Sequence, residues 1–349
     1  MEAKEEEVEK PPPKPVVIIE QFLVFYCSFQ DPPDPYEIEQ LKRAEIACSV
    51  IQVGFIVASN DGTIRHPMRF AGRNISAMNS MSVICCITFQ PQSITKTSHC
   101  TLMTLWKENY NEPSILDNLN KVDGFLSCGS DVIDAYVFEK VPQNPIIGRL
   151  NPTLYFPPTD FTFGEYSCFY CGIDWYALPN AGGIKRPNVL NALNTLDKLG
   201  VLSIYEPEMP HKFKAWTEYR SYKGKIKFDG YSIIQEIRKC GICLALVSCE
   251  DVRSEIIPAR FFEGLAAGVP IITNTNPTIA RWFGDNVFYI DVTNVDRIAQ
   301  QVLDHIAYFK NHSTETLLKL QNCRSIYLDR FGLDVQLKNL IVTIKEMWS

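Results

Sequence analysis

The sequence predicts an α/β protein with two successive units, each built on a parallel sheet with helices on its faces. Three observations predict this. Short apolar runs alternate with helical patterns along the chain, as they do where helices cover a parallel sheet. A proline-rich stretch at residues 141–158 divides that alternation in two. A chain of 349 residues is also long enough for two domains of ordinary size.

The first unit is expected to span residues 16–158. It follows a tail at residues 1–15, whose charge run and proline cluster predict disorder. The expected strands are residues 16–26, 50–58, 82–89, 101–105 and 124–127. The expected helices are residues 36–47, 115–121 and 130–139. Ser130 is a suitable N-cap for the last of these helices, and residues 141–158 then connect the two units.

The second unit, residues 159–330, repeats the alternation more clearly. The expected strands are residues 167–172, 200–205, 224–228, 242–248, 269–273 and 286–290. The expected helices are residues 187–199, 212–219, 231–239 and one that follows a loop within residues 254–268. Residues 331–349 are predicted to form a C-terminal helix.

The composition argues against several classes of function. A net charge of -6 and a pI near 5.5 disfavour a nucleic-acid partner, because neutralising phosphates requires a basic face. No signal peptide is evident, and no apolar run reaches the roughly 20 residues that a membrane span needs, so we expect a cytoplasmic protein. The five histidines form no pair at metal-ligand spacing, and the twelve cysteines are interpreted as ordinary buried thiols, so no metal site is expected.

Basic residues gather where strands of the second unit are predicted to end. Ligands of open parallel sheets bind beyond the carboxyl ends of the strands. Lys185 and Arg186 precede one helix and Arg260 begins another, so helix N-termini add partial positive charge to these cations. We therefore expect an anion such as a phosphate at this edge. Further candidate contacts stand at the strand ends themselves: Gly172, Tyr205, Ser248 and Asn274.

Two carboxylates in the same region are the main candidates for binding hydroxyl groups. Glu255 and Glu263 lie eight residues apart, the first in a predicted loop and the second one turn inside a helix. Both can then point into one cleft, and a carboxylate accepts two hydroxyl groups, so the pair suits a polyhydroxylated ligand. The alternative is that Glu255 is a solvated loop charge and Glu263 a carboxylate that caps the helix.

The residues around these glutamates resemble the nucleotide-binding domain of retaining GT-B fold glycosyltransferases, whose motif is two glutamates separated by seven residues. The segments that match in order are Ser248, Glu255, Phe262-Glu263, Leu265-Ala266, Gly268-Val269-Pro270 and Ile271-Ile272. A wider run, roughly residues 165–330, is similar to the CgeB-like spore-maturation group. It includes residues 170–175, Arg186, and residues 222–230, 260–270 and 283–291.

This resemblance implies two Rossmann-like domains that face each other across a cleft, with the last helix crossing back to the first domain. It implies sugar transfer from a UDP- or GDP-sugar to a glycan, protein or small-molecule acceptor, with retention and without a metal or other cofactor. Glu263 would hold the ribose hydroxyls and Glu255 the donor sugar. Arg186, with Lys185 or Arg260, would neutralise the diphosphate, where negative charge gathers as the bond to the sugar breaks.

Two other classes of function stay open. A non-catalytic subunit that binds sugar nucleotides or assists assembly is favoured by the short first unit, which lacks a glycine-rich loop after its first strand. A dinucleotide-dependent oxidoreductase shares the fold class only. It is disfavoured because the chain has no Gly-x-Gly-x-x-Gly turn after a strand.

Overall fold

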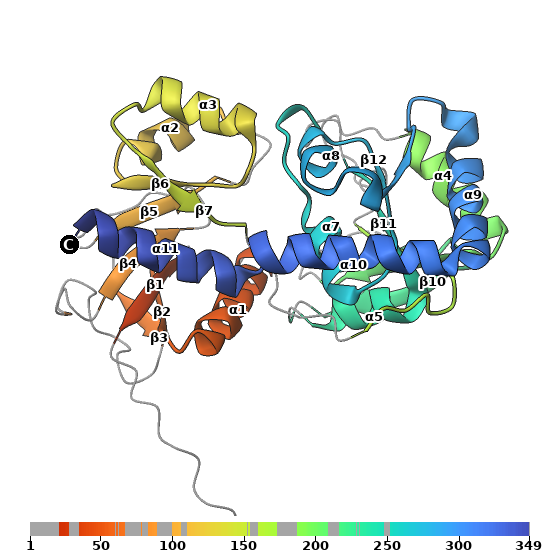
Figure 1. The fold of residues 1–349 in the computed structure, drawn as a ribbon, viewed down its shortest axis with the longest axis horizontal. Coiled ribbons are helices and arrows are strands. Elements are labelled where there is room, and N and C mark those ends of the chain that lie inside the picture. Colours follow the sequence, from red (N-terminus) through yellow and green to blue (C-terminus); the bar gives the residue numbers. More distant parts are fainter. Residues whose placement is uncertain are drawn as a thin grey trace, which may run out of the picture.

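The computed structural model shows two α/β domains side by side, with a long helical segment running along both (Figure 1). The structure describes residues 21–27, 35–59, 61, 63–66, 78, 83–88, 100–105, 110–151, 153, 160–172, 187–208, 216–227, 229, 231–247 and 252–348. No helix within these ranges is both long and apolar enough to cross a bilayer.

The first domain is built on a seven-stranded sheet in the order β3-β2-β1-β4-β5-β6-β7. Neighbouring strands are parallel except β2 and β3. The strands are β1 Phe22–Cys27, β2 Gly54–Ser59, β3 Ile64–His66, β4 Val83–Thr88, β5 Thr101–Thr104, β6 Gly124–Ser127 and β7 Ile146–Arg149. The helices are α1 Pro35–Val50, α2 Pro113–Leu119 and α3 Asp131–Lys140.

The second domain has a six-stranded sheet in the order β10-β9-β8-β11-β12-β13, parallel throughout. The strands are β8 Ser167–Cys171, β9 Leu202–Pro207, β10 Tyr222–Ile226, β11 Gly241–Ala245, β12 Ile271–Asn274 and β13 Phe288–Ile290. The helices are α4 Pro187–Lys198, α5 Ser232–Cys240, α7 Ala259–Ala267, α8 Pro277–Phe283 and α9 Ile298–Asn311, with short 3-10 turns at Gly284–Asn286 and Val295–Arg297.

Two C-terminal helices link the domains. Helix α10 (Ser313–Arg330) runs along the second domain, and α11 (Leu333–Trp348) continues along the first (Figure 1). Leu337 and Leu340 of α11 share a buried core with Leu23 and Phe25 of β1. The C-terminal helix therefore belongs to the packing of the first domain. The predicted fold class, two Rossmann-like domains with C-terminal helices that cross back, is confirmed.

The predicted elements differ from the structure in several places, and helix α8 was not expected. Strand β3 was not expected, and β7 falls inside the segment predicted to be an irregular connection. Strand β7 is an edge strand of four residues between Pro145 and Pro152, and sheet edges tolerate flanking prolines. Residues 216–220 form turns rather than the end of a helix. In the first predicted strand, residues 16–20 lie outside the described residues.

Helix α7 lies unusually close to its sheet because of one glycine. A Cβ on Gly264 would lie 2.9 Å from Cγ1 of Ile271 and 3.0 Å from Cβ of Cys243, on the neighbouring strands β12 and β11. The helix ends at Gly268, whose φ of 68° is left-handed and favours glycine. Glycine at these two positions fixes both the depth and the length of the helix that carries Glu263.

Candidate active site

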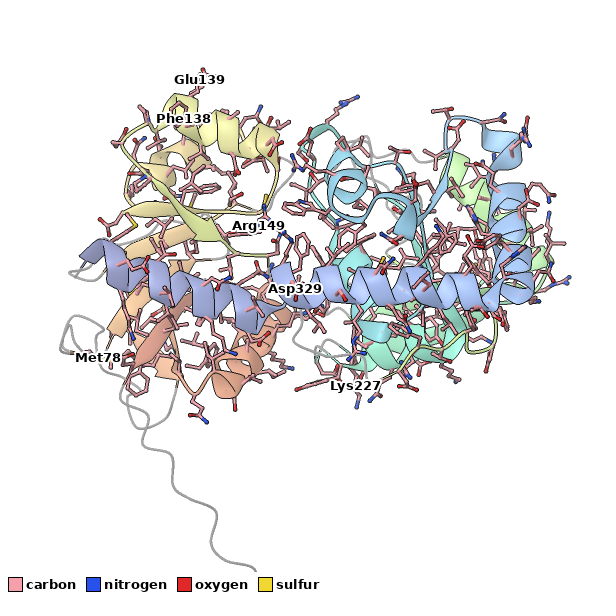
Figure 2. All side chains as sticks on the ribbon, in the orientation of Figure 1. Met78, Phe138, Glu139, Arg149, Lys227 and Asp329 are labelled. Carbon is pink, nitrogen blue, oxygen red and sulfur yellow. The ribbon has the colours of Figure 1, made fainter. Side chains whose placement is uncertain are left out.

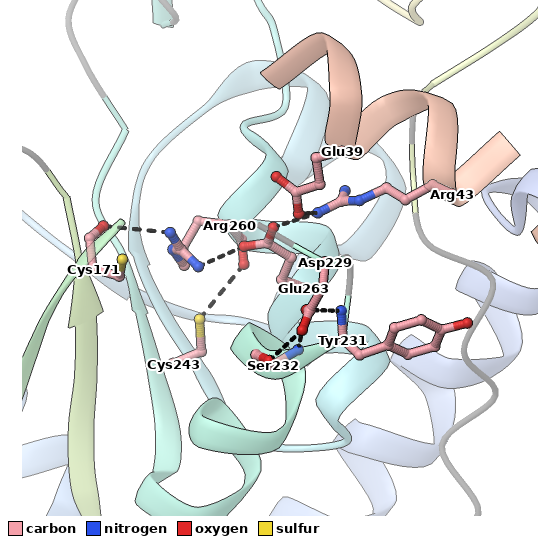
Figure 3. A network of polar contacts seen from close by, with 9 residues as sticks. All are labelled: Glu39, Arg43, Cys171, Asp229, Tyr231, Ser232, Cys243, Arg260 and Glu263. Carbon is pink, nitrogen blue, oxygen red and sulfur yellow. Dashed lines mark hydrogen bonds and ion pairs between the residues drawn. The ribbon is translucent and has the colours of Figure 1, made fainter. Parts of the chain in front are cut away.

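A buried network of charged side chains joins the two domains around Glu263 of α7. The Glu263 side chain is 4% exposed. Its Oε2 accepts a hydrogen bond from Nη1 of Arg260, one turn earlier in the helix, at 2.5 Å. Its Oε1 accepts from Nη2 of Arg43, on α1 of the first domain, at 2.6 Å. Arg43 also pairs with Glu39, so four charges of alternating sign run from α1 to α7 (Figure 3).

The charges in this network favour the ionised forms of Glu263 and Arg43. Burial opposes ionisation of Glu263, but Arg260 and Arg43 outweigh it, and the pKa of Glu263 lies below its usual value. Burial raises the pKa of Glu39, and Arg43 compensates only in part. For Arg43 itself, burial disfavours the charge, but the two carboxylates prevail and raise its pKa. Glu263 is therefore an anion stabilised by one arginine from each domain.

Arg260 extends the network toward the end of the central strand of the second sheet. Its Nη2 lies 3.4 Å from the carbonyl oxygen of Cys171, the last residue of β8, and its guanidinium carbon lies 5.3 Å from the ring centre of Phe169. The side chain is about one fifth exposed, at 21%. Arg260 thus carries a partly accessible positive charge to the carboxyl ends of parallel strands, where an anionic ligand is expected in this fold class.

A second set of contacts between the domains lies around the loop that carries Glu255. Oγ of Ser130, the N-cap of α3, donates to the carbonyl oxygen of Ser254 at 2.6 Å. Arg281 of α8 pairs with Asp131 and donates to the carbonyl oxygen of Gly129 at 2.9 Å. The first domain therefore contacts both the Glu255 loop and the Glu263 helix.

Comparisons with known proteins identify the kind of domain that carries this network. Residues 186–336 match the protein-family model described as "Glycosyl transferase-like". An alpha-glucosyltransferase solved with UDP and a 13-mer DNA is 9% identical and superposes with a TM-score of 0.55, over 93% of this chain and 100% of that one. The chain has the GT-B fold, and its residues 186–336 match a glycosyltransferase-like domain. At this identity, the structural likeness shows the fold alone.

Two further solved structures are similar to the chain. A glycosyltransferase from Rickettsia africae ESF-5 is 11% identical, with a TM-score of 0.52 over 94% of this chain and 98% of that one. TarM is 12% identical, with a TM-score of 0.49 over 78% of this chain, and the chain spans only 58% of the length of TarM. Curated protein sequences gave no match.

In this GT-B protein, the two glutamates of the predicted pair have different environments. Glu263 is buried in the charged network. Glu255 is half-buried and has a left-handed φ of 56°, which is uncommon for a residue other than glycine and indicates a constrained turn. The carbonyl of its neighbour Ser254 is held by Ser130. Glu255 thus lies in a turn and Glu263 in a buried helix, and the expectation that both point into one cleft stays a prediction.

Three further predicted donor contacts make structural bonds in the GT-B protein. The amide of Asn274 accepts from the backbone nitrogen of Val247 at 2.7 Å and donates to its carbonyl oxygen at 3.2 Å, so it fixes the chain just beyond β11. The hydroxyl of Tyr205 donates to Glu236 of α5 at 2.7 Å. The carbonyl of Gly172 accepts from Nε1 of Trp216 at 2.8 Å. Lys185, Arg186 and Ser248 lie outside the described residues.

Sequence reasoning missed Arg43 and Glu39. A glutamate and an arginine four residues apart on a helix are typical of an exposed ion pair, and no local sequence pattern predicts that they are buried. Their partner Glu263 is 220 residues away, so only the tertiary fold brings them together. Among the described residues, no three His, Cys, Asp or Glu side chains gather as a metal site would require. Metal independence stays a prediction.

Proposed function

We propose that the protein transfers a sugar from a UDP- or GDP-sugar to a glycan, protein or small-molecule acceptor, with retention of configuration and without a metal ion. The observation that carries this proposal is the pairing of Glu263 and Arg260 beside the carboxyl end of β8, in a domain that matches a glycosyl transferase-like family. The Glu263 carboxylate suits ribose hydroxyls, and the Arg260 guanidinium suits a phosphate. Both stand where ligands of open parallel sheets bind.

In the proposed reaction, the basic side chains contribute most to catalysis. As the bond between the sugar and the diphosphate breaks, negative charge collects on the leaving nucleoside diphosphate. Arg260, together with Lys185 and Arg186, would neutralise that charge and so lower the barrier. Glu255 would accept hydrogen bonds from hydroxyls of the donor sugar, and its constrained turn would hold it in place for this role.

The position of Arg43 affects how a nucleotide would bind. Both oxygens of Glu263 already accept hydrogen bonds from guanidinium groups. Ribose hydroxyls that bind Glu263 would therefore replace or share the bond from Arg43, since Arg260 and Glu263 belong to the same helix turn. Donor binding would then compete with a contact between the domains.

The proposal is tested by isothermal titration of the full chain with UDP and GDP. We expect one nucleotide to bind, and the Glu263→Ala and Arg186→Ala variants to bind at least tenfold more weakly, because each loses a charged partner of the ligand. Lys140→Met is the matched control, because Lys140 is exposed and pairs only with its neighbour Glu139 among the described residues. If neither nucleotide binds the parent protein, the proposed donor class is wrong.

A second candidate function is a non-catalytic subunit that binds sugar nucleotides. The two arginine partners of Glu263 favour this function, because a carboxylate with a purely structural role would also be paired on both oxygens. Slow hydrolysis of sugar nucleotides separates the two functions, because a pure binding protein releases no sugar. The expectations of a cytoplasmic location and of no nucleic-acid partner remain predictions.

A further inference from the structure

A cavity of about 510 Å³ lies away from the Glu263 network, where the first domain, α8 and the two C-terminal helices meet. Its walls include Ser127 and Asp134 from the β6-to-α3 region, Gly148 and Arg149 from β7, and Trp282 from α8. Arg149 and Asp329 mark its place at the junction of the domains (Figure 2). A volume of this size is in the range of small-molecule sites.

Two arginines meet at one aromatic ring in this cavity. The guanidinium carbon of Arg149 lies 4.7 Å from the ring centre of Trp282, and that of Arg330 lies 4.9 Å from the same centre. Neither arginine forms an ion pair with any residue that the structure describes. Arg149 is partly buried, whereas Arg330 is exposed. A partly buried cation is normally paired, so Arg149, with a second cation beside it, points to an anionic partner from outside the chain.

The electrostatic environment of Arg149 also favours an anionic ligand. Burial lowers the pKa of Arg149, and the positive charges of Arg281 and Arg330 add to that effect, while Asp134 opposes it. Arg281 has its own partner, since it pairs with Asp131. A negative group of a ligand would therefore relieve unfavourable charge at Arg149.

Two residues of the cavity lining carry buried polar atoms that no residue in the described part of the chain satisfies. Oδ1 of Asp134 is buried without a hydrogen-bond partner, while its Oδ2 accepts from Ser127 at 2.7 Å. Nε1 of Trp282 is likewise buried without a partner. One atom is an acceptor and the other a donor, and a hydroxyl group can bond to either kind. Such mixed, unmet groups suit a ligand that carries hydroxyl groups.

The cavity floor leaves room for such a ligand. A Cβ placed on Gly148 would meet only Cδ1 of Leu340, at 3.9 Å. The position thus tolerates a side chain without a clash, and that side chain would take up space in the cavity. Gly148 therefore offers a way to fill the site without touching its polar groups.

We propose that this cavity binds a monosaccharide-sized ligand with hydroxyl groups and one anionic group, either a sugar phosphate or a sugar acid. Arg149 and Arg330 would hold the anionic group, and Asp134 would accept from hydroxyls. Because Asp134 and Arg149 belong to the first domain and Trp282 to the second, the ligand would bridge the two domains. This proposal does not depend on the donor site around Glu263.

The test is titration calorimetry of the full chain with glucose 1-phosphate, glucuronate, glucose and inorganic phosphate. We expect one of the two anionic sugars to bind more tightly than glucose and than phosphate. Arg149→Met should weaken that binding about tenfold or more, because it removes a charge-assisted contact, and Gly148→Val should weaken it by filling the cavity. Lys140→Met should bind like the parent, because its charge lies on α3 outside the cavity lining.

Three results would overturn the proposal. They are no binding of either anionic sugar, equal binding by the parent, Arg149→Met and Gly148→Val proteins, and displacement of the bound sugar by UDP or GDP. The last would place the sugar in the proposed donor site instead. Circular dichroism melting of each variant identifies one that has failed to fold. Because Arg149→Met and Gly148→Val alter different properties of the cavity, either variant alone keeps the test decisive.

Discussion

Replacing Arg43 with methionine should weaken the fold and strengthen nucleotide binding at the same time. The substitution keeps the apolar stem of the side chain but removes the guanidinium that bonds Glu263 at 2.6 Å. Removing one partner of a buried ion pair costs about 3–5 kcal/mol. Glu263 keeps Arg260 as a partner, so we expect the lower end, about 3 kcal/mol.

The predicted effect on binding has the opposite sign. If ribose hydroxyls compete with Arg43 for Glu263, loss of Arg43 frees Oε1 for the ligand. A hydrogen bond to a charged group contributes about 1.5–3 kcal/mol, so the affinity for UDP or GDP should rise by roughly 10- to 100-fold. Urea unfolding measures the loss of stability, and isothermal titration measures the gain in affinity.

Arg281→Met is the matched control, because Arg281 also joins the two domains, through Asp131 and the carbonyl of Gly129. It should leave nucleotide affinity unchanged. If both variants bind the nucleotide more tightly to the same extent, a looser interface rather than release of Glu263 is responsible. If the folded Arg43→Met protein binds no more tightly than the parent, the competition does not exist.

Three further predictions concern the same region. Because the pKa of Glu263 is lowered, ionised Glu263 stabilises the fold above its usual pKa of 4.5, and this stabilisation is lost as the pH falls through the lowered pKa. The raised pKa of Glu39 has the opposite effect on stability. Glu263→Gln should therefore reduce the loss of urea stability as the pH falls below 4.5; an unchanged acid slope would contradict this. Gly264→Ala should destabilise by about 1–3 kcal/mol, because its Cβ would lie 2.9 Å from Cγ1 of Ile271, although alanine favours helices; a gain in melting temperature would refute it. Ser130→Ala should cost about 1–2 kcal/mol, since it loses the N-cap of α3 and the 2.6 Å bond to Ser254, and Ser130→Thr should restore most of this in the same melting assay.

The sequence was informative wherever local patterns determine structure. The loop, helix and strand around Glu263 could be predicted because Gly268 ends the helix and an apolar strand follows it. The alternation of elements was enough for the two-domain fold class. Strand β7 could not be predicted, because four residues between prolines look like a connection unless the sheet edge beside them is known.

The candidate site could be predicted only in part, because some of its contacts depend on tertiary packing. Glu263 and Arg260 are one helical turn apart, so their proximity follows from the sequence. The pairing of Glu263 with Arg43 depends on how the two domains pack, which no local pattern encodes. Asn274 also shows the limit of the strand-end rule, because its amide bonds to Val247 rather than facing outward.

The central claim is that the domain around Glu263 and Arg260 binds a sugar nucleotide and breaks its bond to the sugar. The most direct measurement is release of UDP or GDP from a panel of sugar nucleotides by the full chain without an acceptor. We predict slow release from at least one donor, reduced at least tenfold in Arg260→Met, with the parent rate kept in Lys140→Met. No release from any donor, or equal release by Arg260→Met and the parent, would contradict the claim.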